Sequence, residues 1–242
     1  MSSNPMIQKD FATETVLEGH PMTVAGAINK TAILTAIVVG VAYYTWTICA
    51  GGFSDKANML LYGGAIAGFI LALIASFKPQ TSPITAPAYA VCEGFVVGAI
   101  SYAYGSMVDG IVYNALAITF LALFAMLLLY RTGAITSNPI FQKVVWVSTF
   151  AVAIFYFAGF IGALFGHPMT IFNGGMLGIG VSLLICVIAS LNFILDFRFI
   201  EQGEKSMLPS YFEWYGAFAL LVTLVWLYLE VLRLLAQLNR RD

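Results

Sequence analysis

The chain has 242 residues, of which 60% are hydrophobic and only 10% are charged. A soluble domain carries about 25% charged residues, so this composition excludes a soluble enzyme, a disordered protein and a small disulfide scaffold. Eleven basic and twelve acidic residues give a net charge of -1, which leaves no basic surface for nucleic acid.

Seven apolar runs approach or exceed the length of a membrane-spanning helix, which needs about 20 residues. In chain order they are roughly Thr31–Ala50, Met59–Phe77, Ala88–Tyr104, Ile111–Tyr130, Val144–Phe165, Met176–Phe197 and Tyr211–Leu238. Because lipid offers the backbone no hydrogen-bond partner, each run is predicted to be helical. Connections rich in glycine and proline separate the runs, among them Pro79 through Pro87 and Gly203 to Pro209.

The sequence therefore predicts an all-α membrane protein whose single domain, residues 31–238, is a seven-transmembrane-helix bundle. A polar tail at 1–30 precedes it, and a short tail at 239–242 follows it. The third run is the weakest, since it is short and contains Glu93. A re-entrant segment there would leave six crossings and return the carboxyl terminus to the side of the amino terminus.

Basic residues in short loops mark the cytoplasmic side of a membrane protein. The first, third and fifth connections hold only Lys56. The amino-terminal tail and the other connections hold seven basic residues, namely Lys9, Lys30, Lys78, Arg131, Lys143, Arg198 and Lys205. This asymmetry predicts a cytoplasmic amino terminus.

The cysteines and histidines form no pattern typical of a metal site. Cys49, Cys92 and Cys186 are scattered through apolar runs, where cysteine usually packs as a small apolar side chain. The segment Gly19–Thr23 recurs as Gly166–Thr170, and its proline and threonine are explained as helix-start residues. Since no catalytic or phosphate-binding motif is present either, we expect no enzyme activity, no catalytic residues and no cofactor.

Acidic residues within the apolar runs are the best indication of function, because each costs about 2.5–3.5 kcal/mol to insert. Glu93, Asp196 and Glu230 are of this kind. The runs place Glu93 about four residues inside the cytoplasmic end of its helix and Asp196 at the cytoplasmic end of its own. Glu213 lies near the start of the seventh run, where we expect the membrane interface, and could join them at the cytoplasmic mouth. Glu230 lies about 25 Å further along the helix than Glu213, in the other half of the membrane. Arg233 follows Glu230 on nearly the same helix face and is its expected charge partner.

Buried carboxyls suit two kinds of cargo. Hard cations such as calcium prefer carboxylate and carbonyl oxygens as ligands. Protons are the other candidate, because burial and neighbouring like charges raise the pKa of a carboxyl group towards neutrality.

Several short segments are typical of one family of membrane proteins. They are Met22-Thr23-Val24, Lys30 to Leu34, Pro87 to Gly94, Arg131-Thr132-Gly133, Leu195 to Glu201, and Leu227 to Glu230. On these segments, from Asn4-Pro5 to the last run, the chain resembles the Bax inhibitor family of transmembrane Bax inhibitor motif proteins, particularly its bacterial branch.

The resemblance implies a bundle whose last helix is central, located in the bacterial inner membrane. It also implies a pH-sensitive calcium leak, gated by two carboxyls that share a proton and bind calcium transiently. Matched residue by residue to this sequence, the pair is Asp196 and Glu230. Glu93 would add to the negative electrostatic field or supply a ligand oxygen. This chain has Glu where the family usually has Asp in the seventh helix, and a longer segment between the acids. Either the seventh helix starts outside the membrane, or Glu213 partly replaces Glu230 as the partner of Asp196.

Three functions of different classes follow as hypotheses. The first is a calcium or cation leak channel in the lipid bilayer. The second is a non-conducting regulator that binds a membrane-protein partner, such as a membrane protease or a stress-response factor. The third is a proton-coupled carrier.

Overall fold

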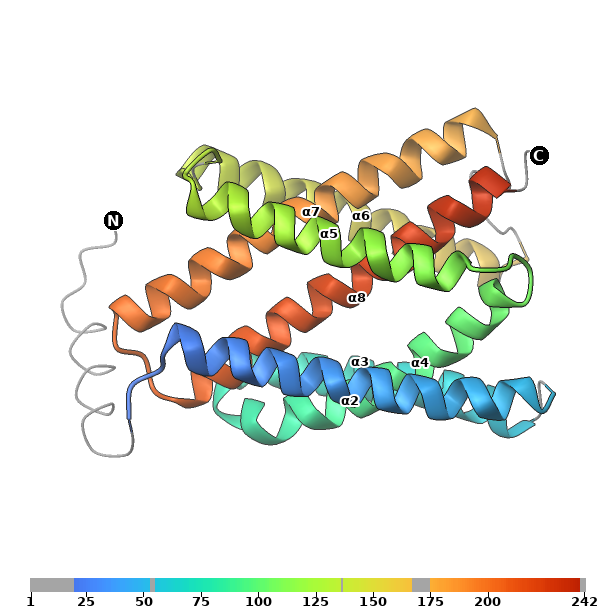
Figure 1. Ribbon diagram of the computed structural model, residues 1–242, viewed down its shortest axis with the longest axis horizontal. Coiled ribbons are helices and arrows are strands. Elements are labelled where there is room, and N and C mark those ends of the chain that lie inside the picture. The colour runs from blue at the N-terminus through green and yellow to red at the C-terminus, as the bar shows by residue number, and fades with distance from the viewer. Residues whose placement is uncertain (1–19, 53–54, 136, 167–174, 240–242) are drawn as a thin grey trace. The chain divides into compact units, whose positions relative to one another are not determined.

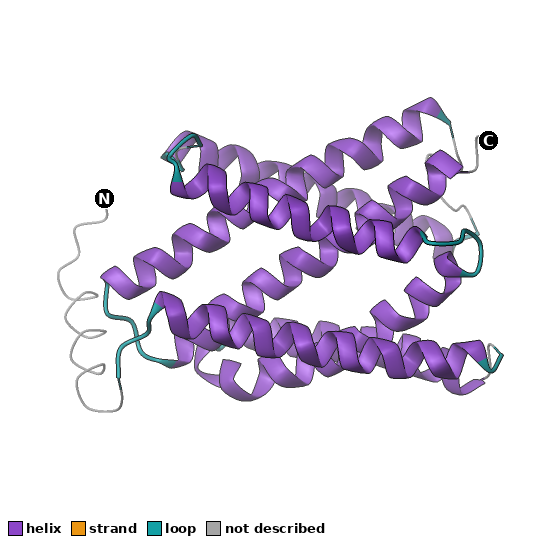
Figure 2. Cartoon of the chain, viewed as in Figure 1, coloured by secondary structure: helices purple, strands orange, loops and turns teal. Residues whose placement is uncertain are grey.

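The computed structural model describes residues 20–52, 55–135, 137–166 and 175–239. These residues form seven long α-helices and one short 3-10 turn, Pro79–Thr81 (Figures 1 and 2). The helices are α2 (Val24–Ala50), α3 (Asp55–Phe77), α4 (Ser82–Gly105), α5 (Ile111–Arg131), α6 (Pro139–Leu164), α7 (Met176–Lys205) and α8 (Tyr211–Asn239). All seven are long and apolar enough to cross a membrane. The predicted all-α seven-helix membrane protein is confirmed.

The helices are longer than the apolar runs that predicted them. α2 begins at Val24, seven residues before the predicted Thr31, because the Thr23 side chain caps its first turn by accepting a hydrogen bond from the N–H of Gly26. α4 begins at Ser82, so Pro87, expected in a connection, lies inside the helix. α7 continues to Lys205, so Gly203, also expected in a connection, is helical.

The beginning of α2 contacts the connection between α7 and α8. The N–H of Met22 donates to the carbonyl of Leu208 at 2.8 Å, and the N–H of Thr23 donates to Glu213 at 2.8 Å. Six helices separate these places in the chain, and six crossings return a chain to the side where it began. A re-entrant α4 would give five crossings and leave the contacting residues on opposite sides. The contact therefore favours seven crossings over six with a re-entrant segment.

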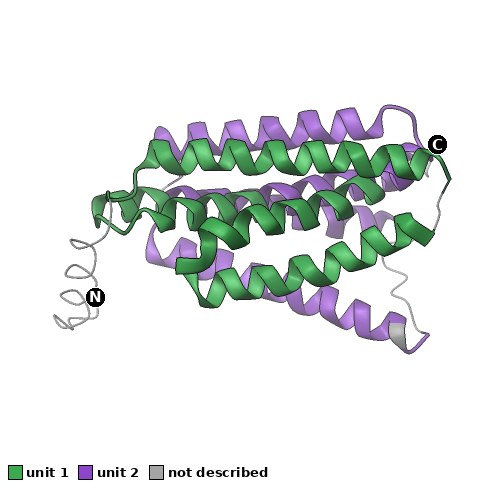
Figure 3. Cartoon of the chain, turned by 90° about the horizontal axis from the view of Figure 1, so that it is seen from below, with its two compact units in different colours: residues 1–100, 198–222 green, residues 101–197, 223–242 purple. Residues whose placement is uncertain are grey.

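The chain divides into two compact units, which are described separately (Figure 3). Unit 1 comprises residues 1–100 and 198–222, and therefore holds α2, α3, most of α4, the end of α7 and the start of α8. Unit 2 comprises residues 101–197 and 223–242, with the end of α4, all of α5 and α6, most of α7 and the rest of α8. Among the seven described helices, α8 is the most buried. In its most apolar 18-residue stretch 56% of the residues are buried, whereas the value for α6 is 11%.

Within unit 1, glycines on α4 allow a close approach of α2. A Cβ atom on Gly98 would lie 2.4 Å from the carbonyl oxygen of Ala42 and 2.7 Å from the Cβ of Thr45. A Cβ on Gly94 would lie 2.6 Å from that of Val41. Since the obstacles at Gly98 include backbone atoms, any side chain there would push the two helices apart.

We expect Gly98→Ala to destabilise the protein, because overpacking of a close helix contact costs about 1–3 kcal/mol. Gly40→Ala on α2 is the matched control, since a Cβ there meets nothing within 4 Å and alanine favours a helix over glycine. Thermal unfolding in detergent should show a lower midpoint for Gly98→Ala and an unchanged or higher one for Gly40→Ala. Equal midpoints for the two variants would show that the approach of α2 and α4 is looser than described.

Candidate functional site

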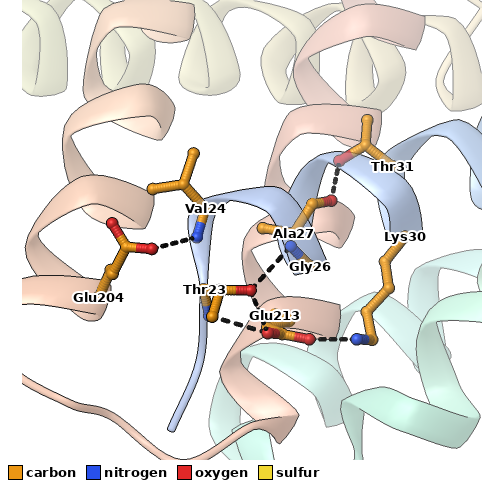
Figure 4. Close-up of polar contacts among 8 residues, drawn as sticks. All are labelled: Thr23, Val24, Gly26, Ala27, Lys30, Thr31, Glu204 and Glu213. Atoms are coloured by element: carbon orange, nitrogen blue, oxygen red, sulfur yellow. Dashed lines mark hydrogen bonds and ion pairs between the residues drawn. The ribbon is translucent and has the colours of Figure 1, made fainter.

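In unit 1, two acidic side chains bind the first turn of α2. We call Thr23, Lys30, Glu204 and Glu213 the anchor cluster (Figure 4). Oε1 of Glu213 accepts hydrogen bonds from the N–H and hydroxyl of Thr23, at 2.8 and 3.0 Å. Oε1 of Glu204, in the last turn of α7, accepts from the N–H of Val24 at 2.9 Å. These carboxylates satisfy N–H groups that have no partner within the helix, at the end where the helix dipole favours negative charge.

The second oxygen of Glu213 forms an ion pair with Lys30, which lies seven residues after Thr23. The ammonium group of Lys30 also lies 5.5 Å from the ring centre of Trp214. Gly26 makes room for the carboxylate, because a Cβ at this position would lie 2.2 Å from Oε1 of Glu213. Glu213, expected at the membrane interface, is 8% exposed and holds structural partners from another helix.

In unit 2, Glu230 belongs to a cluster that also contains Tyr156 and Arg233, here called the arginine cluster. The Tyr156 hydroxyl donates to Oε1 of Glu230 at 2.5 Å. Nη1 of Arg233 lies 3.2 Å from Oε2 of Glu230 and donates to the Tyr156 hydroxyl at 2.5 Å. The guanidinium group also lies 5.1 Å from the Tyr156 ring centre. Glu230 is only 2% exposed, so its negative charge is balanced inside the protein by Arg233.

Asp196 has a different environment within unit 2. Its Oδ2 accepts a hydrogen bond from the hydroxyl of Thr223 on α8 at 2.7 Å. Thr223 is buried, and Asp196 itself is half-buried. Among the described residues the structure gives Asp196 no ion pair. Its carboxyl group is thus held by a neutral partner.

Asp196 and Glu230 do not share a hydrogen bond in the part of the chain that the structure describes. Thr223, which bonds Asp196, and Glu230 both lie on α8. They are seven residues apart, which corresponds to about 10 Å along the helix axis. The family resemblance implies that these two carboxyls form one pair. In the structure they have different partners, at separate positions along α8. Glu213 has its own partners within unit 1.

Glu93 lies in unit 1, near the middle of α4. Tyr89 lies one turn earlier on the same helix. A Cβ on Gly68 of α3 would lie 3.9 Å from Oε2 of Glu93, so the carboxylate is directed towards α3.

The expected depths of two acids in their helices were wrong. Glu93 was counted about four residues inside its helix but lies eleven residues after Ser82, the first residue of α4. Asp196 was placed at a helix end but lies nine residues before Lys205, the last residue of α7. Both acids are therefore far from the ends of their helices.

Sequence reasoning missed the partners of these acids. Tyr156, Thr223 and Glu204 are ordinary members of their helices, and no sequence signal marks them. Thr23 and Lys30 were noted in family-like segments, and also in the repeated segment and among the basic residues, but not as partners of an acid. The second copy of the Gly-His-Pro-Met-Thr segment, apart from Gly166, falls outside the described residues. Among those residues, no three His, Cys, Asp or Glu side chains come together to hold a metal ion.

The anchor cluster predicts a difference between two lysines that each pair with a glutamate. Lys30→Met would leave the buried Glu213 carboxylate without its cation, and we expect a loss of about 1–3 kcal/mol in the free energy of unfolding. Lys205→Met removes a pair with Glu201 in which the lysine side chain is 69% exposed, and such pairs contribute about 0–1 kcal/mol. Thermal unfolding of both variants in detergent measures the difference, and similar losses for both would contradict the structural role of Lys30.

Comparison with known proteins identifies the family. A family model described as Bax inhibitor 1 like matches residues 4–240, nearly the whole chain. A search of curated protein sequences gives no significant match. The chain belongs to the Bax inhibitor 1 like family and is an integral membrane protein with seven apolar helices.

Proposed function

We propose that this protein is a pH-sensitive leak channel for cations, with calcium as the expected cargo. The observation that carries the proposal is Asp196, an acid well inside α7 that, within the described part of the chain, is bonded by the neutral hydroxyl of Thr223 and by no cation. An ionised carboxylate without a cationic partner attracts a mobile cation. Its oxygens are also of the kind that calcium prefers.

The arginine cluster supports a different role for Glu230. Because Arg233 balances its charge, Glu230 contributes little net field to a passing cation. The hydrogen bonds of Tyr156 to both groups hold α6 and α8 together at this point. In this proposal Asp196 is the titrating group, and Glu230 keeps the neighbouring helices in place.

The direction of the pH effect follows from the charge of Asp196. At low pH a proton neutralises the carboxyl, and the attraction for a cation disappears. As pH rises, the proton leaves and the negative charge returns. Cation flux is therefore expected to increase with pH.

The amino terminus is proposed to face the cytoplasm, because the basic residues gather in the tail and in the even-numbered connections. Single cysteines at Ser106 and Ser206, both exposed, test this in a cysteine-free background. Ser106 follows α4 and should react with an impermeant thiol reagent added to intact cells. Ser206 follows α7 and should react only after the membrane is opened. The reverse pattern would invert the topology.

Calcium flux into proteoliposomes containing a calcium-sensitive dye tests conduction and its pH dependence. We expect Asp196→Asn to flatten the pH dependence, because the amide cannot lose a proton. Glu230→Gln should retain the pH dependence but lower thermal stability, since it leaves Arg233 without its carboxylate.

Glu213→Gln is the control for a carboxyl with a structural role, and it should leave the pH profile of flux in place. If Glu230→Gln alone flattens the profile, the titrating group is Glu230 and the assignment to Asp196 is wrong. Absence of flux from the parent protein would favour a non-conducting regulator. Flux that saturates and requires a proton gradient would favour a carrier.

A further inference from the structure

Two buried side chains of unit 2 carry polar atoms that have no hydrogen-bond partner among the described residues. They are the hydroxyl of Ser182 on α7 and both amide atoms, Oε1 and Nε2, of Gln237 on α8. Ser182 is 0% exposed and Gln237 is 3% exposed. The other such atoms, on Ser82 and Ser137, lie at or before the first residue of a helix. Ser182 and Gln237 are thus the two cases within the helices themselves.

The hydroxyl of Ser182 differs from comparable hydroxyls in this protein. Two turns later on the same helix, Ser190 donates to the carbonyl of Cys186 at 2.8 Å. Thr45 and Thr119 donate in the same way to carbonyls four residues earlier. This local bond normally satisfies a serine or threonine inside a helix. Ser182 does not make it, so its hydroxyl is available to another partner.

Both side chains lie on the same side of the arginine cluster along the membrane normal. Gln237 is one turn beyond Arg233 and two turns beyond Glu230, towards the end of α8. On α7, Ser182 lies fourteen residues before Asp196, which bonds Thr223 of α8, and Gln237 lies fourteen residues after Thr223. Because α7 and α8 are consecutive crossings, they run in opposite directions. The start of α7 and the end of α8 are therefore on one side of the membrane.

Unpartnered buried polar atoms are expensive, at about 1–3 kcal/mol for each group. The side-chain amide of Gln237 has two N–H donors and one carbonyl acceptor, and the structure gives neither of its atoms a partner. Water bridging such groups removes most of the cost. Two such groups on one side of a buried ion pair would give water a way to reach it.

We propose that Ser182 and Gln237 line a water-filled path that leads from the start of α7 and the end of α8 to the arginine cluster. The path admits water and small hydrated cations, which its hydroxyl and amide oxygens can contact. It deepens the proposed leak function by naming the route on one side of the membrane. Arg233, whose side chain is 30% exposed, stands at the inner end of this route.

Reaction of single cysteines with a small, cationic and impermeant methanethiosulfonate tests the path, because such reagents react with a thiolate in water. Ser182→Cys and Gln237→Cys are made in a background without Cys49, Cys92 and Cys186, and studied in proteoliposomes. Both should react with reagent on the side that labels Ser106→Cys. Neither should react with reagent on the side that labels Ser206→Cys.

Equally buried apolar positions on the same helices provide matched controls. Ile185 on α7 is 3% exposed and Leu232 on α8 is 0% exposed. Cysteines at these positions should not react, because they face packed apolar side chains. If Ser182→Cys and Gln237→Cys are as unreactive as these controls in folded protein, the path does not exist.

A second pair of variants covers the case in which a cysteine prevents folding. Ser182→Ala and Gln237→Met remove the unpartnered atoms and should fold. If water occupies the path, together they should reduce calcium flux several-fold, while flux like that of the parent would overturn the role of the path.

The two proposals fail in different ways. Labelling of both cysteines without any calcium flux in the parent would retain the path and reject the leak channel. Calcium flux without labelling of either cysteine would retain the channel and reject the path.

Discussion

Lipid offers no hydrogen-bond partners, so the acids inside the described helices depend on partners from the protein itself. Glu213, Glu230 and Asp196 have such partners among the described residues. Glu213 binds the first turn of α2 and Lys30, and Glu230 binds Tyr156 and Arg233. Asp196 has no cationic partner among the described residues and accepts a hydrogen bond from the neutral hydroxyl of Thr223. In the proposed function, this difference in partners separates Glu213 and Glu230, which stabilise the fold, from Asp196, which exchanges protons or cations.

The seven helices could be predicted because hydropathy directly reports which segments enter a bilayer. Their ends could not, since hydropathy does not distinguish a helix that stops at the membrane surface from one that continues into water. α7 continues past the apolar run into Arg198, Glu201 and Lys205, which are polar but helical. α2 begins before its apolar run because Thr23 and two distant carboxylates satisfy its first turn. The errors in the depths of Glu93 and Asp196 have this same origin.

The acids of the candidate site could be found in the sequence, whereas most of their partners could not. An acid among apolar residues is conspicuous because its insertion is costly. A tyrosine or threonine in the same setting is common and carries no signal. Tyr156 is 74 residues from Glu230, and Thr223 is 27 residues from Asp196. Only the packing of α6, α7 and α8 determines which hydroxyl reaches which carboxyl.

The bond between Thr23 and Glu213 joins residues that are 190 positions apart in the chain. Synthesis proceeds from the amino terminus at about 5–20 residues per second, so roughly 10–40 seconds pass between the two residues. During this interval α2 is already made, but the carboxylates that satisfy its first turn are not. Water must bind those N–H groups meanwhile, which holds this end of α2 at the membrane surface. α2, the first of the described helices to be synthesised, is therefore among the last of them to reach its final packing, because it waits for α8.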